Sequence, residues 1–263
     1  MDKFKIRCSA IGKIMAGSIG LSEPQERKLK TFQDKIKAGK DLTDLQAKEN
    51  DKLVNLKDNP ELPQGAKTYC KQWLKEKLYK RRREFGSKYT DKGNECEDKA
   101  IEFISDWKFK PLKKNEEFFH DEYMTGTPDV LGSPMIDVKC SWDEQTFPVL
   151  EDDLPDKDYY YQGQGYMNLC GGDKFEVIYC LMNAPFSIIQ DEARRASYKS
   201  NLSEADLMEK YMKLMTFDDV PNKLRIKIFK FDRDQKVIDE IKARVKMCQA
   251  YIDELLKGLG DYE

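Results

Sequence analysis

The clearest hydrophobic pattern along the chain is helical and lies in residues 64–83. Its apolar residues recur every three or four positions, as on one face of a helix: Ala66, Tyr69, Cys70, Trp73, Leu74 and Leu78. The same spacing predicts further helices over 159–169, 203–215 and 232–256. The segment 159–169 contains two glycines, which lower helix propensity but allow another backbone to approach closely.

Shorter apolar runs predict the strands. Residues 174–182 are apolar almost throughout, which is typical of a central strand, and residues 224–231 alternate as a strand with one exposed face. Residues 116–123 are predicted to be a strand that leads into a hairpin. The arms of that hairpin are Thr127–Leu131 and Met135–Cys140, joined by a turn at Gly132-Ser133-Pro134.

The hairpin carries the candidate chemistry. Side chains alternate faces along a strand, so Asp137 and Lys139 point the same way, and Asp129 can face the same edge from the first arm. Two neighbouring carboxylates repel unless a cation lies between them, and oxygen ligands suit Mg²⁺ or Mn²⁺. A lysine beside such a cation can orient water or offset phosphate charge. An exposed hairpin with solvated charges gives the same Asp-x-Lys pattern.

One glutamate of the preceding helix joins this group by periodicity. The helix opens at residues 92–100 and ends near Trp107. Glu97 shares a stripe with Ala100, Ile101 and Ile104, whereas Glu95 lies on the opposite, charged face. Because an inward carboxylate is costly unless it is paired or bound to a metal, Glu97 is the residue that we expect beside Asp129 and Asp137.

Two segments near the N-terminus suggest contacts outside this centre. Ser9 is predicted to cap a short helix, and a helix start is a potential phosphate site. Residues 22–62 fit an inserted arm of two charged helices, because Ser22 with Gln25 and Thr43 with Gln46 have capping-box spacing. The arm is interpreted either as a clamp near a channel or as a solvated extension.

Composition places any polyanion contact in a local patch. The chain has 263 residues and a net charge of only −2, although 36% of its residues are charged. Residues 67–92 contain ten Lys or Arg and only three acidic residues, and the basic cluster includes Arg81, Arg82 and Arg83. This segment is either a solvated helix face or a surface for a phosphate backbone.

Residue counts exclude several other classes of site. Seven scattered cysteines with no C-x-x-C, and no signal peptide, predict reduced thiols in a cytoplasm and no zinc or iron–sulfur cluster. The single histidine, His120, excludes a His-based metal site and a Ser-His-Asp triad. No apolar run approaches the length that crosses a membrane.

Five motifs in order resemble the PD-(D/E)xK nuclease superfamily, and within it the YqaJ-type phage recombination exonucleases, which include the phage lambda exonuclease. They are Ser9-Ala10 followed by Ile14, Gly93 to Ala100 with Glu97, Thr127-Pro128-Asp129, Asp137-Val138-Lys139, and Gln162-Gly163-Gln164-Gly165-Tyr166. The resemblance covers most of the chain outside 22–62. The chain departs from the family in this charged arm, in an acidic loop at 142–158, and in having Asp137 where glutamate is usual.

The resemblance implies a single α/β (α+β) domain over 1–263 with a restriction-endonuclease-like core, in which helices flank a mixed central sheet. It implies a Mg²⁺-dependent deoxyribonuclease, with Mn²⁺ as a substitute. Asp129, Asp137 and the Val138 carbonyl would hold the metal, and Glu97 a second metal or a metal-bound water. Lys139 would act on the attacking water, with Gln162 and Tyr166 as supporting residues.

For the substrate, the resemblance implies 5′ to 3′ digestion of linear duplex ends during phage recombination in a bacterial cell. Arg7 and Ser9 would take the 5′ end phosphate, and Arg81, Arg82 and Arg83 would follow the backbone. A single-strand annealing protein and a ring trimer are the implied partners. The alternatives are an endonuclease with the same core, a RecB-like nuclease component, and a DNA-binding protein of the same fold without catalysis.

Overall fold

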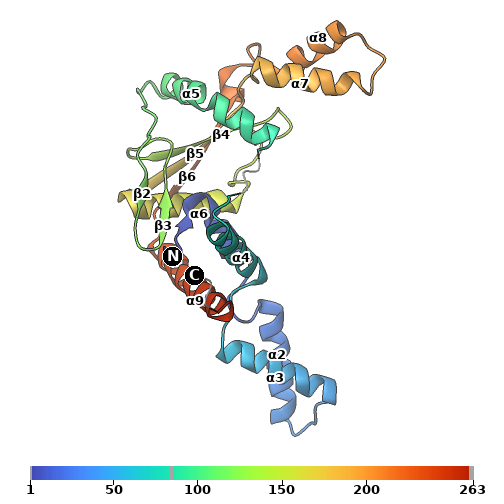
Figure 1. Ribbon diagram of the computed structural model, residues 1–263, viewed down its shortest axis with the longest axis vertical. Helices are drawn as coiled ribbons and strands as arrows, with labels where there is room; N and C mark the ends of the chain where they lie inside the picture. The colour runs from blue at the N-terminus through green and yellow to red at the C-terminus, as the bar shows by residue number, and fades with distance from the viewer. Residues whose placement is uncertain (1, 83–85, 261–263) are drawn as a thin grey trace.

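The structure, a computed structural model, describes residues 2–82 and 86–260. It contains two three-stranded sheets, with helices around them and a pair of helices projecting at each end of the long molecule (Figure 1). The predicted mixed α/β architecture is therefore confirmed, with the strands divided between two sheets. None of the helices in these described ranges has the length and apolar character needed to cross a lipid bilayer.

The larger sheet has the order β4-β5-β6. β5 (Lys174–Cys180) is central as predicted, parallel to β4 (Met135–Cys140) and antiparallel to β6 (Ile226–Asp232). Its residues Phe175, Val177 and Ile178 are almost completely buried. A strand buried on both faces needs apolar residues at successive positions, which explains the apolar run from Val177 to Cys180. The buried Glu176 is the exception, and it is paired with Lys108 at 2.6 Å.

The smaller sheet is made of very short strands. β3 (Met124–Gly126) lies between β1 (Ile6–Arg7), to which it is parallel, and β2 (Phe119–His120), to which it is antiparallel. The prediction of a strand over 116–123 was too long. The Asn115 side chain accepts from the Glu117 amide, and that of Asp121 accepts from the Tyr123 and Met124 amides. These local hydrogen bonds bend the chain on both sides of β2.

The helix α6 (Lys157–Cys170) packs closely against its neighbours because of its glycines. A Cβ atom at Gly163 would lie 2.6 Å from the Phe231 ring, and one at Gly165 would lie 2.5 Å from Ile11 Cδ1. The glycines therefore place the helix backbone directly against β6 on one side and α1 (Ile11–Met15) on the other. This close packing holds the polar face of α6 near β4.

Three long helices depart slightly from their predicted limits. α4 (Gln64–Leu78) ends five residues before Arg83, because Lys80 adopts a left-handed conformation and the chain turns away. α5 (Lys88–Lys108) begins four residues earlier than predicted, with Ser87 as its N-cap. α9 (Gln235–Gly258) closes the chain and packs with α4 and α6 on the main hydrophobic core.

The prediction that Ser9 caps an N-terminal helix was wrong. Ser9 lies inside the 3₁₀ turn η1 (Cys8–Ala10), and the following α1 starts after Ala10 without a side-chain cap. The buried Cys8, Ile11 and Ile14 fix this segment in the main core, and the Ser9 side chain is left exposed.

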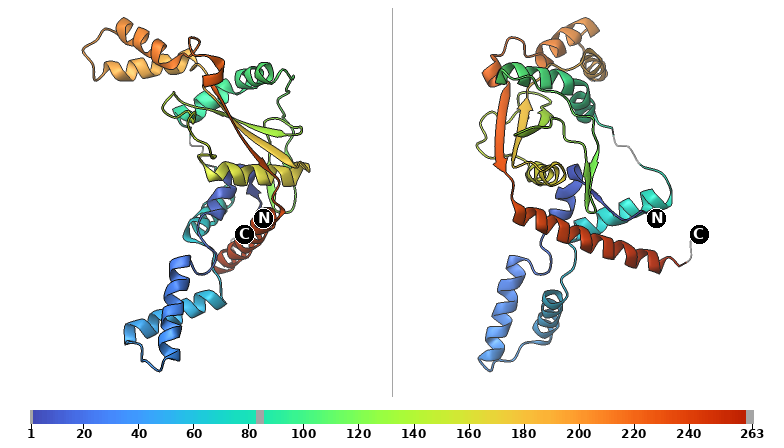
Figure 2. Two further views of the ribbon diagram at one scale, coloured as in Figure 1. Left: turned by 180° about the vertical axis from the view of Figure 1, so that it is seen from behind. Right: turned by 90° about the vertical axis from the view of Figure 1, so that its left-hand side faces the viewer.

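The inserted arm consists of α2 (Glu23–Lys37) and α3 (Asp44–Asp58), capped at Ser22 and Thr43 as predicted. It has its own small apolar cluster of Leu29, Phe32 and Leu53. The arm projects from one end of the molecule, and α7 (Phe186–Ser197) with α8 (Glu204–Met215) projects from the other (Figure 2). The loop predicted over 142–158 is irregular up to residue 156, and its last two residues form the first turn of α6.

Candidate active site

Only part of the predicted hairpin forms. Its second arm is β4, but in the first arm only Val130 bridges to the opposite strand, with both backbone hydrogen bonds to Ile136 at 3.1 Å. The prediction of a strand over Thr127–Leu131 was therefore wrong beyond that residue. Asp129 is held instead by its side chain, whose Oδ2 accepts from the Val138 amide at 2.7 Å, and by its carbonyl, which accepts from Asn115. This arrangement places the Asp129 carboxylate beside β4.

Asp137 is the most deeply buried carboxylate of the group, with 1% of its surface exposed. Its Oδ1 accepts a hydrogen bond of 2.8 Å from Gln162 Nε2 on α6. Its Oδ2 forms an ion pair with Lys139 Nζ at 2.6 Å and has no hydrogen-bond partner among the described residues. A buried carboxylate oxygen without a hydrogen bond is a natural ligand for a cation.

Lys139 lies on the same face of β4 as Asp137, with a quarter of its side chain exposed. Burial alone would lower the pKa of its ammonium, but the carboxylates of Asp137 and Asp129 outweigh that effect and raise the pKa above its ordinary value. The ammonium also lies 4.6 Å from the centre of the Tyr159 ring. Lys139 is therefore positively charged at neutral pH in the metal-free protein.

The environment of Asp129 disfavours its charged form, in contrast to that of Lys139. Burial and the negative charge of Asp137 raise the pKa of its carboxyl to about 7, against the opposing effects of Lys139 and the Val138 amide. The raised pKa means that the metal-free site does not readily hold two ionised aspartates together. A divalent cation between them would remove that repulsion.

Glu97 stands at the side of this pair. It is half-buried on α5, whereas Glu95 is exposed, and its charge contributes to the raised pKa of Asp129. Its carboxylate lies 3.0 Å from Lys114 Nζ, which also lies 2.7 Å from Asp98. In this metal-free arrangement the nearest cation to Glu97 is thus a lysine that the sequence analysis did not identify.

Gln162 and Tyr166 extend the site into α6. Both are buried, and Gln162 Nε2 lies 3.3 Å from the Tyr166 hydroxyl in addition to its hydrogen bond with Asp137. Their spacing of four residues places them on one helix face, as predicted from the sequence. Gln162 holds one oxygen of Asp137 and thereby turns the other toward Lys139 and Asp129.

The residues present fit a divalent cation held by two aspartates. Among the described residues, no group of three or more His, Cys, Asp or Glu side chains already converges to hold a metal. Asp129 and Asp137 nevertheless supply hard oxygen donors, and one of these oxygens is buried without a hydrogen bond. The assignment of Val138 and Glu97 as further ligands stays a prediction.

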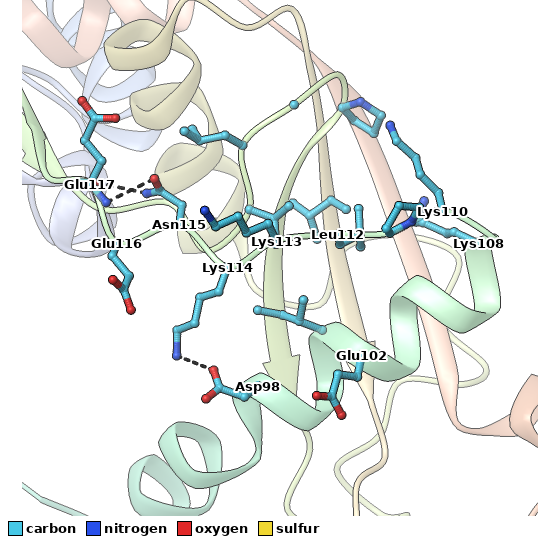
Figure 3. A pocket seen from close by; sticks show the side chains of 17 residues that line it. Asp98, Glu102, Lys108, Lys110, Leu112, Lys113, Lys114, Asn115, Glu116 and Glu117 are labelled. Carbon is cyan, nitrogen blue, oxygen red and sulfur yellow. Dashed lines mark hydrogen bonds and ion pairs between the residues drawn. The ribbon is translucent and has the colours of Figure 1, made fainter.

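A cleft of about 1000 Å³ opens between α5 and residues 110–117 (Figure 3). Lys113 and Lys114 lie on one wall, and Asp98 and Glu102 on the α5 side. Its lining includes Val130 and Ile136, the chain neighbours of Asp129 and Asp137, but neither aspartate itself. Lys114, which contacts Asp98 across the cleft, therefore connects it to Glu97.

The predicted DNA-contacting residues are only partly brought together. Arg7, Arg81 and Arg82 line a second cleft of about 800 Å³. Ser9 is exposed but does not line this cleft, and Arg83 falls outside the described residues. Two further residues, Lys114 and Tyr159, contact the candidate site without having been predicted. Lys114 had no sequence signal, whereas Tyr159 lies on the same helix as Gln162.

The chain is similar in fold to solved exonuclease structures. The chain is similar to a phage-related exonuclease from Haemophilus somnus 129PT, with 28% identity, a TM-score of 0.69 and coverage of 98% of each chain. It also resembles an alkaline exonuclease from Laribacter hongkongensis at 12% identity and a TM-score of 0.57, covering 97% of this chain and 91% of that one. The same enzyme in complex with dAMP gives 13% identity and a TM-score of 0.56.

No family model matches the chain, and no curated protein sequence does. The structural likeness nevertheless extends over nearly the whole chain, including the inserted arm, because coverage reaches 98%. The chain therefore has the fold of the phage-type exonucleases of the PD-(D/E)xK superfamily, which confirms the resemblance seen in its motifs.

Proposed function

We propose that this chain is a metal-dependent exonuclease that hydrolyses phosphodiester bonds of DNA. The observation that carries the proposal is the buried trio on and beside β4. Asp137 Oδ2 lacks a hydrogen bond, the pKa of Asp129 is raised to about 7, and a charged Lys139 lies 2.6 Å from Asp137. Such a group is unfavourable as a purely structural element, but it suits binding of a cation and a phosphate.

The chain's own residues would act as follows. Asp129, Asp137 and the Val138 carbonyl would hold Mg²⁺ or Mn²⁺, which when bound lowers the pKa of water and screens phosphate charge. Lys139, which is protonated in the metal-free protein, would orient the attacking water and offset phosphate charge. The water oxygen would bond to phosphorus while the bond from phosphorus to the 3′ oxygen breaks. The water would lose one proton to solvent, and the 3′ oxygen would take up one proton from solvent. The products carry a 5′ phosphate and a 3′ hydroxyl.

Gln162 acts as a positioning residue in this scheme. It fixes one oxygen of Asp137, so the other oxygen stays directed at the cation position. Glu97 would be available to a second cation or its water only after it leaves Lys114, which lies 3.0 Å away. Polarity from 5′ to 3′, a duplex end as substrate, an annealing partner and a ring of subunits are supported by the family resemblance alone.

The test is digestion of a linear duplex, 5′-phosphorylated and labelled at either end, with Mg²⁺ or with EDTA. Wild type should release nucleotides from the 5′ end only with Mg²⁺, and Lys139→Ala should lose at least a hundredfold in rate. Lys199→Ala, an exposed lysine on the segment between α7 and α8, is the control and should cleave like wild type.

Two outcomes would redirect the proposal. Cuts within closed circular DNA would show an endonuclease with the same core. Retained DNA binding without cleavage under any divalent metal would show a binding protein of this fold, and the charged trio would then need another explanation.

A further inference from the structure

The second cleft, of about 800 Å³, lies against the smaller sheet and shares no lining residue with the first cleft. Its floor is the outer face of β1, β3 and β2, and its wall is the C-terminal end of α4 with the residues that follow. The sheet register places Arg7 opposite Thr125, and Thr125 opposite His120. Directly opposed residues share a face, so these three form one row across the floor of the cleft.

The opposite face of the same sheet explains why this row points outward. Ile6 and Met124, one position before Arg7 and Thr125, are completely buried in the main core. Alternation along a strand therefore forces their neighbours into the cleft. The fold therefore makes the floor of the cleft polar, and its side chains point to where a ligand could bind.

Positive charge dominates the cleft. Its lining contains seven Lys or Arg and two acidic residues, Asp2 and Glu76. Lys3 pairs with Glu122 and Lys77 approaches Asp2, but Lys5, Arg7, Lys80, Arg81 and Arg82 form no ion pair within the described part of the chain. A polyanion backbone would neutralise this excess of positive charge.

An exposed aromatic residue gives the cleft a second kind of contact. Phe118 lines it with 61% of its surface exposed, and its ring centre lies 6.2 Å from that of His120. Trp73, by contrast, packs its ring edge-on against Phe4 at 5.1 Å and is part of the core packing. Phe118 thus exposes its ring beside five cations that form no ion pair with any described residue, and this combination binds single-stranded nucleic acids.

We infer that this cleft binds a single-stranded DNA segment, with its phosphates on Arg7, Arg81 and Arg82 and a base stacked on Phe118. A duplex would present its phosphates to the cations but keep its bases stacked inside, so the exposed ring would have no partner. The inference rests on the proposed function in one respect: the single strand would be the strand that remains after the exonuclease has digested the other. Binding itself requires no catalysis.

The experiment measures binding in EDTA by fluorescence anisotropy, with single-stranded dT of about twelve nucleotides and an abasic oligomer of equal length and charge. Wild type should bind dT about tenfold more tightly than the abasic oligomer. Phe118→Ala should lose that preference, with abasic binding unchanged. Phe109→Ala removes a ring that is 97% exposed outside the cleft, and it should behave like wild type.

A charge variant tests the phosphate contacts separately. The double variant Arg81→Ala with Arg82→Ala should weaken the binding of both oligomers. It should also lower the slope of log affinity against log salt by about 1.4, because each phosphate contact contributes about 0.7 to that slope. The control pair is Lys37→Ala with Lys40→Ala, two exposed lysines on the arm. Circular dichroism confirms that each variant is folded.

Equal binding of dT and the abasic oligomer by wild type, or an equal loss for both in Phe118→Ala, would overturn the inference. The inference would also be overturned if, in competition, an unlabelled blunt duplex displaced labelled dT at the same concentration as unlabelled dT does. If the base-dependent binding holds but wild type shows no cleavage with Mg²⁺, the proposed exonuclease fails and the single-strand site stands.

Discussion

Replacing Asp129 by Asn should stabilise the metal-free protein at pH 8, although Asp129 belongs to the candidate active site. The carboxyl is buried and faces the charge of Asp137, so its ionisation is unfavourable in the folded state. Asparagine keeps an oxygen that can accept from the Val138 amide, which the carboxylate does at 2.7 Å. The substitution therefore removes the charge and retains the hydrogen bond.

The magnitude follows from the pKa of Asp129, which rises from 3.8 to about 7 on folding. A pKa raised on folding means stability that is fully present below 3.8 and is lost as pH rises through 7. The difference of about three in pKa corresponds to about 4 kcal/mol at pH 8. Asp129→Asn should recover up to that amount at pH 8 and almost nothing at pH 4.

The assay is urea unfolding in EDTA at pH 4, 6 and 8, and again at pH 8 with Mg²⁺. Wild type should gain stability from Mg²⁺ and Asp129→Asn should not, because the mutant lacks one charged donor. Asp137→Asn is the matched comparison and should destabilise the protein by about 3 kcal/mol, since it leaves the Lys139 charge without its nearest partner. A loss of stability at pH 8 in Asp129→Asn would refute the reasoning.

Three further predictions concern Glu97, α6 and the arm. Lys114→Met should free Glu97 and tighten Mg²⁺ binding several-fold in calorimetry, and unchanged affinity would show that their ion pair does not compete with metal. Gly163→Ala should destabilise by about 1–3 kcal/mol through overpacking against aromatic rings, whereas Gly93→Ala, with open space around it, should stabilise by up to about 1 kcal/mol in thermal unfolding. Replacing residues 22–59 by a short Gly-Ser linker should change the melting temperature by only a few degrees, because the arm has its own apolar cluster; a large drop would show that it supports the core.

The candidate site could be predicted in part because it depends on local periodicity. Alternation along one strand places Asp137 and Lys139 on the same face, and helical spacing separates Glu97 from Glu95 and joins Gln162 to Tyr166. Such relations extend over four residues or fewer, so they survive errors in where an element begins or ends. The central position of β5 followed from composition for a similar reason.

Contacts between distant segments were not predictable in this way. Lys114 reaches Glu97 because an irregular segment passes across α5, and no periodic pattern describes such a segment. In the row of Arg7, Thr125 and His120, the position of Arg7 depends on the pairing of β1 with β3, which lies more than a hundred residues away in the sequence. The strand β2 is shorter than predicted because the Asp121 side chain accepts hydrogen bonds from nearby backbone amides. The hydrophobic pattern gives no information about such hydrogen bonds.

The energetics of the trio on β4 bear on the choice between an enzyme and a binding protein of the same fold. In a protein that only bound DNA, replacing Asp129 with a neutral residue would improve stability with no loss of function. Asp137 could likewise be replaced together with Lys139, because well-packed apolar residues often match or exceed the stability of a buried ion pair. Stability alone thus gives no reason for two crowded carboxylates, one with an oxygen that accepts no hydrogen bond from the described residues. A role that uses their charge, such as holding a cation for phosphodiester hydrolysis, supplies that reason.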